Sequence, residues 1–298
     1  MARSNLSRSE LEWCRPAGLA DLGIVCCTRI SRTSMVAESW LIGWQGIGSS
    51  WIDIGSAHHQ LSTGDVNFVP PRTAVCLLPS EPASRYFALL VPPEAVLQAA
   101  TELSSGTVTA LPSILPVLRA GNIDAAALQM YFTVADSDDQ LRVRAAWNDL
   151  MGQILTSSSP GDAVPASDPR PVQRAREFLH ARADELVSLD EIAHAAGVSK
   201  YYLVRLFHST VGMSPYRYHL CVRAERARNL LDRGSTPSQA AAAAGFFDQS
   251  HFTRVFKKVF GVTPGMYARA PNRWRQLPTP PPAHLEDEST PTAERNGP

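Results

Sequence analysis

The stretch AGVSKYYLVRLFHSTVGMSP, residues 196–215, returns further along the chain as AGFFDQSHFTRVFKKVFGVTP, residues 244–264. Together with the residues that follow, both stretches carry the pattern Arg-x-Phe-x4-Gly-x2-Pro-x2-Tyr, which starts at Arg205 in the first and at Arg254 in the second. The offset is 49 residues throughout this pattern, whereas Gly197 and Gly245 are 48 residues apart. We therefore expect one structural unit to occur twice, with one extra residue just before the second helix of the second copy.

Each copy carries the signals of two short helices joined by a tight turn. Ser188 and Glu191 match a capping box at the start of the first helix of the first copy. Gly197 suits the turn, because glycine adopts a positive φ without steric cost. Ser199 and Asp248 occupy the N-cap positions of the helices that follow. A helix, a short turn and a second helix form the helix-turn-helix plan, whose second helix can enter the major groove of DNA.

The second helix of each copy separates apolar from polar residues. The apolar stripes are Leu203, Leu206 and Phe207 in the first copy and Phe252, Val255, Phe256 and Val259 in the second. The outward residues are Tyr201, Val204, Arg205 and His208 in the first copy and Gln249, Ser250, Thr253, Arg254 and Lys257 in the second. Arg and Gln can bridge base edges, each worth about 1–3 kcal/mol of discrimination. Packing roles stay open for Tyr201, Tyr202 and His251, and about half of the outward residues are expected to contact only phosphate or water.

A longer helix over residues 215–231 is expected to join the two copies and to end at Gly234. Its predicted inward face is Leu220, Ala224, Ala227 and Leu231. Its predicted source of positive charge is Arg217, Arg223, Arg226 and Arg228. A stiff connector can hold two reading helices about 34 Å apart, which is one turn of B-DNA.

The charge of the chain is uneven, although its formal net charge is zero. Residues 1–169 carry a net charge of −6, residues 170–275 of +9 and residues 276–298 of −3. The basic segment indicates a polyanionic partner. The five cysteines contain no CxxC pair, which favours a reducing compartment without disulfides or a zinc site. With no apolar leader and no apolar run of about 18 residues, we expect a cytoplasmic protein without a membrane partner.

The N-terminal half changes from strand to helix patterning. Residues 23–91 contain short alternating segments, which favour a small antiparallel barrel or sandwich. Helical spacing follows over residues 94–103, 124–135 and 139–155, and in the last segment Leu141, Ala145, Leu150 and Ile154 are expected on one face. The Ser- and Pro-rich residues 156–171 predict a domain boundary near residue 165.

Residues 175–270 resemble the AraC/XylS family of bacterial transcription regulators, and AGFFDQSHFTRVFKKVFGVTPGMYAR is similar to the family's signature region. The resemblance implies an all-helical DNA-binding domain of two helix-turn-helix units joined by a long helix. It places base contacts on Tyr201, Val204, Arg205, Gln249, Ser250, His251 and Arg254, and we add Lys200 and Lys257 as DNA-binding candidates. Val204 is a departure, because its side chain has no hydrogen-bonding group. The first unit is therefore expected to read a thymine methyl group or DNA shape. The alanine-rich QAAAAAGF is a second departure and should leave base contacts unchanged.

The segment LSTGDVNFVPP, residues 61–71, is similar to the cupin-like sensor and dimerisation domain of such regulators, over about residues 20–92. The implied fold class is a multidomain α+β protein. It would comprise a cupin-like β-barrel with dimerisation helices for effector sensing over residues 1–165, a double helix-turn-helix DNA-binding domain over residues 170–275 and a disordered Pro-rich acidic tail over residues 276–298.

A metal-dependent enzyme of the cupin type, fused to a DNA-binding module, is the alternative hypothesis. Such a site needs histidines and a carboxylate that converge on one cavity. His58 and His59 are adjacent and would point to opposite faces of a strand, and no other histidine precedes His180. Neither a metal nor a catalytic set is therefore predicted. Four aromatic residues either line an apolar ligand pocket or fill the barrel interior: Trp40, Trp44, Trp51 and Phe68.

The sequence thus predicts a sequence-specific DNA-binding transcription regulator that is not an enzyme and needs no cofactor. The resemblance favours an activator that binds double-stranded DNA as a homodimer and contacts RNA polymerase, with repression open. It also implies a small-molecule effector, which the sequence does not identify.

Overall fold

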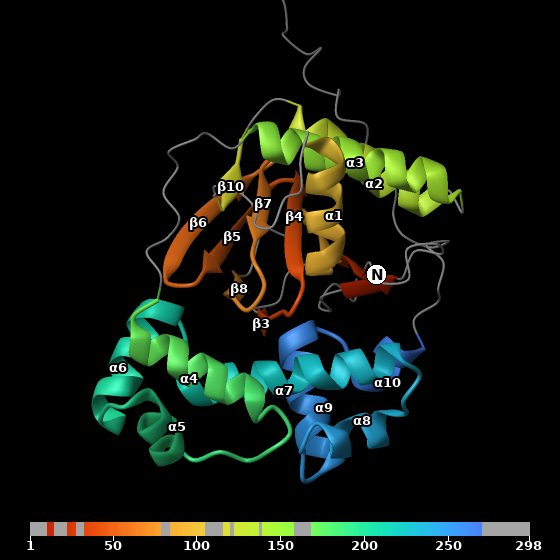
Figure 1. The fold of residues 1–298 in the computed structure, drawn as a ribbon. Helices are drawn as coiled ribbons and strands as arrows, with labels where there is room; N and C mark the ends of the chain where they lie inside the picture. Colours follow the sequence, from red (N-terminus) through yellow and green to blue (C-terminus); the bar gives the residue numbers. More distant parts are fainter. Residues whose placement is uncertain are drawn as a thin grey trace, which may run out of the picture.

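The computed structural model describes residues 11–14, 23–27, 33–78, 84–104, 116–119, 122–136, 139–157 and 168–269. An N-terminal unit of strands and three helices is stacked on a C-terminal unit of helices (Figure 1). The expected boundary near residue 165 and the tail from residue 276 lie outside the described residues.

The described strands form two antiparallel sheets. The larger sheet has the order β1 (Leu11–Cys14), β2 (Gly23–Cys27), β9 (Arg85–Val91), β4 (Trp40–Ile47), β7 (Val66–Val69), β10 (Val117–Leu118). The smaller sheet has the order β3 (Thr33–Val36), β8 (Ala74–Leu78), β5 (Ser49–Ile54), β6 (Ala57–Ser62). Within these strands no ladder joins the two sheets, so the predicted barrel is not closed.

The central strands of the larger sheet, β4, β7 and β9, are buried on both faces. Their burial therefore does not require a closed barrel. Leu41 and Leu90 point from β4 and β9 into the core shared with the smaller sheet. Ile42, Trp44 and Phe87 point the other way, into a second core. The helices that complete this second core are α1 (Pro93–Leu103), α2 (Ile123–Asp136) and α3 (Gln140–Thr156). A helical layer thus covers the face that a barrel would have left in solvent.

The three helices of the N-terminal unit lie where the helical spacing predicted them. On the predicted face of α3, Leu150 and Ile154 are buried as expected, but Leu141 and Ala145 are not. Leu141 is 78% exposed, and Ala145 is also exposed. The buried face is Val143, Ala146, Trp147, Leu150, Met151 and Ile154. Leu141 lies in the first turn, where the Asp139 side chain caps the helix by accepting from the Leu141 amide at 2.9 Å.

Trp40 and Trp44 pack in aromatic pairs, and the cavity beside Trp44 is far smaller than a small-molecule pocket. Trp40 stacks on Phe68 at 4.5 Å between ring centroids, and Trp44 stacks on Phe87 at 5.0 Å. Both pairs belong to the helix-facing side of the larger sheet, not to a barrel interior. The cavity beside Trp44 measures about 20 Å³, whereas small-molecule pockets span roughly 300–1,000 Å³. Trp51 is 39% exposed.

The C-terminal unit contains the repeated elements in the expected order. Its helices are α4 (Arg170–Ala181), α5 (Leu189–Ala196), α6 (Lys200–Val211), α7 (Pro215–Asp232), α8 (Pro237–Ala243), α9 (Gln249–Phe260) and α10 (Pro264–Ala268). In Figure 1, α7 runs from the group of α4, α5 and α6 to the group of α8, α9 and α10. None of the described helices is long and apolar enough to cross a membrane.

The predicted caps and turn are confirmed. Ser188 and Glu191 form the capping box of α5, and Gly197 follows it with a φ of 71°. Ser199 caps α6 by accepting from the Tyr202 amide, and Asp248 caps α9 by accepting from the His251 amide. The sequence analysis missed a second capping box, Thr236 with Gln239, although its T-x-x-Q spacing is readable.

The two units meet where β3 lies against α7 and α9. Arg217 of α7 donates to the Ser34 hydroxyl, and the Cys221 thiol lies 3.4 Å from the Ser34 carbonyl oxygen. The Ser34 hydroxyl in turn lies 3.2 Å from the Cys76 sulfur. Both cysteines are buried as free thiols, and burial raises the pKa of Cys221 to about 12. Cys221 is therefore an inert packing residue at this contact.

A polar network forms the second contact between the units. Glu38 accepts from Arg72 at 3.0 Å and pairs with His180 of α4 at 2.7 Å. His180 also lies 2.9 Å from the Tyr218 hydroxyl, which donates to the Arg72 carbonyl oxygen at 3.1 Å. Burial raises the pKa of Tyr218 to about 12, so the phenol keeps its proton. Arg176 donates to the same hydroxyl at 3.2 Å and to the same carbonyl oxygen.

The two turn glycines of the repeat allow a matched test of packing. Gly197 and Gly245 have φ of 71° and 72°, so an alanine carries the same backbone strain at both. A Cβ at Gly245 would overlap the Asp184 carbonyl oxygen, whereas at Gly197 it would meet only the Arg174 side chain at 3.3 Å. We expect Gly197→Ala to cost about 1–2 kcal/mol and Gly245→Ala to cost clearly more, as measured by urea unfolding. Equal losses would contradict the overlap.

The network at Glu38 predicts an acid-dependent loss of stability. Hydrogen bonding from His180 is the main cause that lowers the pKa of Glu38 from 4.5 to about 2, with burial opposing and Arg72 assisting. Ionised Glu38 therefore stabilises the folded chain above about pH 4.5, and this contribution is lost as the pH falls toward 2. As the pH is lowered from about 4.5 to about 2, the unfolding midpoint should fall more steeply in the wild type than in Glu38→Gln.

Glu177→Gln is the matched control, because Glu177 lies exposed on the helix that carries His180. The unfolding midpoint of Glu177→Gln should fall with pH as steeply as that of the wild type. If the midpoint of Glu38→Gln fell equally steeply, the result would count against the network.

Candidate DNA-binding surface

Helix α6 presents the first predicted reading face. Leu203 and Phe207 are buried and Leu206 packs beside them, as predicted. Tyr201 is 81% exposed, and Arg205 is also exposed. The opposite, outward face is therefore open to a partner.

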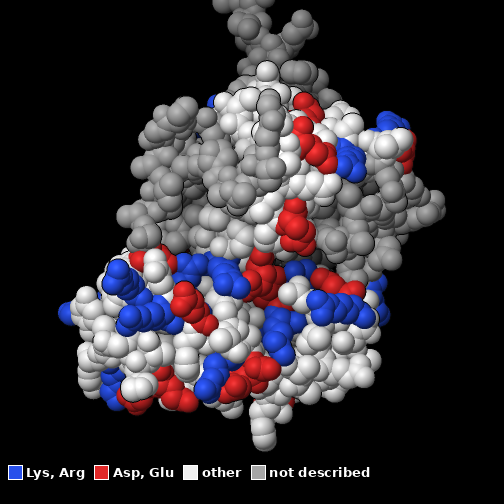
Figure 2. All heavy atoms as spheres, viewed as in Figure 1, with Lys and Arg blue, Asp and Glu red and all other residues white. Residues whose placement is uncertain are grey.

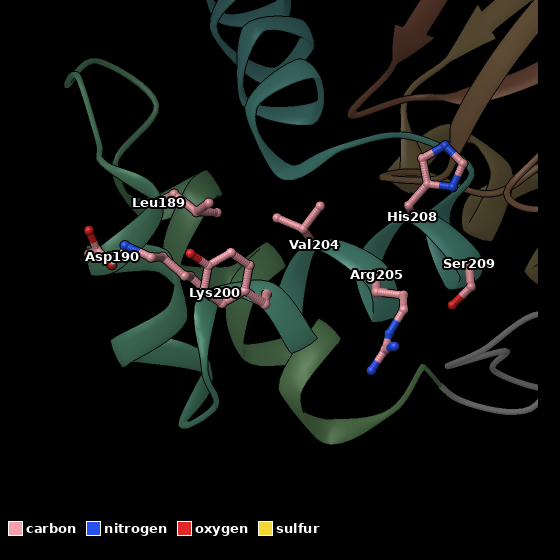
Figure 3. A pocket seen from close by; sticks show the side chains of 8 residues that line it. Leu189, Asp190, Lys200, Val204, Arg205, His208 and Ser209 are labelled. Carbon is pink, nitrogen blue, oxygen red and sulfur yellow. Dashed lines mark ion pairs between the residues drawn. The ribbon is translucent and has the colours of Figure 1, made fainter.

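A groove about 800 Å³ in volume runs along this face. Its lining is Leu189, Asp190, Lys200, Tyr201, Val204, Arg205, His208 and Ser209. Lys200 pairs with Asp190 at 3.2 Å, and Figure 3 shows its amine turned toward that carboxylate while Arg205 extends away from the ribbon. Half-buried Val204 lies between them in the same view. The groove thus combines an apolar floor with a guanidinium at its side.

Helix α9 presents the second predicted reading face. The apolar stripe is confirmed, with Phe252, Phe256 and Val259 buried and Val255 packed against the core. Of the predicted outward residues, Gln249, Ser250, Arg254 and Lys257 are exposed, whereas Thr253 is half-buried. His251 is half-buried, with its ring 5.6 Å from that of Phe246 in an edge contact. This contact matches the packing role that the sequence left open for His251.

The arginines of α7 were predicted to supply positive charge, and for two of them this is wrong. Arg223 is 1% exposed and donates to the Ala244 carbonyl oxygen at 3.0 Å and to that of Gly245. Its guanidinium lies 4.3 Å from the centre of the Phe246 ring, and burial lowers its pKa. Arg223 thus ties α7 to the turn that precedes α9.

Arg228 is 6% exposed and is held between two carboxylates. It pairs with Glu225 at 2.8 Å and with Asp232 at 2.7 Å. Burial alone would lower the pKa of Arg228, but Glu225, Tyr267 and Asp232 hold it above the ordinary value. Glu225 lies three residues before Arg228 and Asp232 lies four residues after it. This spacing in the sequence indicates ion pairs along one helix.

The other two arginines of α7 also make internal contacts. Arg226 is exposed and pairs with Asp184 at 3.0 Å, while Arg217 reaches Ser34 of the N-terminal unit. Figure 2 shows Lys and Arg gathered over the C-terminal unit with Asp and Glu among them. The face in this view is therefore of mixed sign.

The two adjacent histidines of β6 lie as their sequence positions predicted. His58 is exposed, bonds the Asp53 carboxylate and stacks on Trp51 at 4.6 Å. His59 is half-buried, and burial is the main cause that lowers its pKa. Across the residues that the structure describes, no group of three or more His, Cys, Asp or Glu could hold a metal ion.

Comparison with known proteins identifies the C-terminal unit. Residues 192–270 match a family described as "Helix-turn-helix domain". The chain is 27% identical to the uncharacterized HTH-type transcriptional regulator YbfI of Bacillus subtilis over 72% of its own length and 78% of that protein. It is 35% identical to the HTH-type transcriptional regulator GbdR of Pseudomonas aeruginosa over 31% of its length and 26% of that protein. It is 34% identical to the right origin-binding protein of Escherichia coli over 38% of its length and 39% of that protein.

The fold of the whole chain has a solved counterpart. The crystal structure of a single-residue variant of apo ToxT from Vibrio cholerae matches with a TM-score of 0.52 at 12% identity, over 84% of this chain and 97% of that chain. At this identity the match shows a shared arrangement of N-terminal sheets and C-terminal helices.

These findings define the class of protein. The chain is a DNA-binding transcription regulator and not an enzyme, and its relatives carry regulator names. Its helix-turn-helix domain is of the AraC type, which confirms the resemblance drawn from the repeated stretch.

Arg228 and Arg226 provide a matched test of the α7 arginines. Removal of Arg228 leaves Glu225 buried without its partner, so Arg228→Ala should cost about 3–5 kcal/mol. The exposed Arg226–Asp184 pair should contribute no more than about 1 kcal/mol. Urea unfolding of Arg228→Ala and Arg226→Ala measures both values. Equal stability in the two variants would refute a structural role for Arg228.

Proposed function

We propose that the chain is a sequence-specific regulator whose two helix-turn-helix units read successive major grooves of one DNA duplex. The observation that carries this proposal is the pair of exposed faces on α6 and α9. Each face belongs to a capped helix that packs its apolar stripe inward, and α7 joins the two groups. A helix placed in this way can insert its outward residues between the walls of the groove.

The proposed contacts are the nine residues drawn from the sequence: Lys200, Tyr201, Val204, Arg205, Gln249, Ser250, His251, Arg254 and Lys257. Arg205, Gln249 and Arg254 are exposed and carry groups that can bridge base edges. Lys257, also exposed, is suited to phosphate. The half-buried Val204 offers an apolar surface to a thymine methyl group. The two units should therefore read different sequences, although they share one plan.

We further propose a cupin-like sensing and dimerisation domain over residues 1–165, joined to the DNA-binding domain over residues 170–275. The support is the pair of contacts between the units, at Ser34 and at Glu38, through which a change in the strands reaches α4 and α7. Under this proposal the protein is a cytoplasmic homodimer that responds to a small-molecule effector. We also propose that the protein activates transcription through contact with RNA polymerase. Helices α2 and α3 are the proposed dimerisation helices.

Substitutions at the reading arginines test the function. The full-length chain is used to select a preferred duplex from a random pool, and each base pair of that duplex is then varied. Arg205→Ala and Arg254→Ala should each lose about 1–3 kcal/mol, roughly 5- to 150-fold in affinity, at particular base pairs. Fluorescence anisotropy at fixed salt measures the affinities.

Arg226→Ala is the control in this experiment, because that side chain pairs with Asp184 within the chain. Its affinity should stay within about threefold of the wild type. If Arg205→Ala or Arg254→Ala instead weakened binding equally on every sequence, that arginine would be a phosphate contact. Selection of no preferred duplex would refute the proposed function itself.

A further inference from the structure

The extra residue of the second unit can be identified as Phe247. In the first unit, Val198 alone separates Gly197 from the capping residue of α6, and it packs against the core. In the second unit, both Phe246 and Phe247 separate Gly245 from the capping residue of α9. Phe246 takes the packing role, since it is buried and its ring lies 5.1 Å from that of Phe252. Phe247 is thus the residue that the first unit lacks.

Phe247 has the most exposed large apolar side chain in the described part of the chain. It is 96% exposed, and the next is Tyr201 on α6. These two aromatic residues lie at the N-terminal ends of the two reading helices, Phe247 immediately before the cap of α9 and Tyr201 in the first turn of α6. Each of these two ends thus offers an aromatic ring in water, whose burial against an occupant would be favourable.

The turn itself gives no reason for an aromatic residue at this position. Its shape is set by Gly245 with a φ of 72°, by the Asp248 cap and by buried Phe246. Arg223 fixes the same turn from α7 through the carbonyl oxygens of Ala244 and Gly245. The side chain of Phe247 therefore projects from a rigid support, which suits a directed contact.

The neighbours of Phe247 decide which occupant fits. Gln249 and Ser250 follow it closely and are exposed, and Arg254 and Lys257 lie on the exposed side of the same helix. The N-terminal end of a reading helix is the end that contacts base edges, and its partial positive charge favours an anionic partner. In the major groove, the apolar feature that an aromatic ring can contact is the 5-methyl group of thymine.

We propose that Phe247 contacts the 5-methyl group of a thymine at the edge of the site read by α9, and so contributes to sequence specificity. This inference rests on the proposed function. It assigns the second unit an apolar contact beside its polar ones, through a residue outside the set that the family resemblance supplied. The contact would also shield the ring from water in the complex.

The test combines Phe247→Ala with removal of single methyl groups from DNA. Each thymine in the half of the selected duplex protected by α9 is replaced in turn by deoxyuridine, which keeps the hydrogen-bonding edge and lacks only the methyl group. At one position the wild type should lose roughly three- to tenfold in affinity, the effect of uncovering about one methyl-sized group and its neighbours. Phe247→Ala should lose a similar factor on the thymine duplex and show no further loss on the deoxyuridine duplex.

Leu103→Ala is the control variant, because Leu103 is also an exposed apolar residue but lies at the end of α1, outside the reading helices and the proposed dimerisation helices. It should bind both duplexes like the wild type. A thermal melt of Phe247→Ala should match the wild type, since the removed ring makes no core contact in an environment 96% open to solvent.

Three outcomes would overturn the inference and leave the proposed function in place. Phe247→Ala could bind every duplex like the wild type, or could remain as sensitive to each deoxyuridine as the wild type. It could also keep full DNA affinity and lose transcription activation, in which case the ring faces a protein partner. Failure of the wild type to select any duplex would instead overturn the proposed function.

Discussion

The burial of two arginines of α7 is the constraint on which the C-terminal unit depends. Arg228 is enclosed by Glu225 and Asp232, and Arg223 binds the backbone of the turn before α9. A guanidinium removed from water is tolerated only where its donors are matched by carboxylates or carbonyl oxygens at good geometry. Through Arg223, this requirement ties α7 to the turn that precedes α9. The two buried arginines, which the sequence analysis expected to supply positive charge, therefore support the helices instead.

The duplication produces two units of one plan and two different surfaces. In the first unit, Val204 and Tyr201 give the groove beside α6 an apolar floor, and the charge of Lys200 is matched by Asp190. In the second unit, Gln249, Ser250 and Arg254 are open and polar. Under the proposed function, a shared scaffold with unlike outward residues would let one chain distinguish two neighbouring stretches of duplex. Packing constraints hold the scaffold alike in the two copies, and these constraints do not act on the outward residues.

The contact between the units links the strands to the scaffold of the reading helices. Ser34 reaches both Arg217 and Cys221 of α7, while Glu38 and Arg72 reach His180 and Tyr218. Tyr218 is the tyrosine of the repeated pattern in its first copy, and Tyr267, its counterpart, bonds Asp232 at 2.7 Å within the C-terminal unit. The repeated tyrosine therefore contacts the N-terminal unit in the first copy, whereas in the second copy it bonds α7 within the C-terminal unit.

The sequence by itself determined the repeat, its capping residues, its turn glycine, the apolar stripes of α6 and α9 and the exposure of Arg205, Gln249, Ser250 and Arg254. These features are local, because caps and stripes follow from spacings of a few residues along the chain. Tertiary structure alone decided the role of Arg223, the face of α3, the helical cover over Trp44 and the open arrangement of the two sheets. Each of these depends on which distant segment supplies a carboxylate, a carbonyl oxygen or an apolar surface, and periodicity within one element carries no information about that partner.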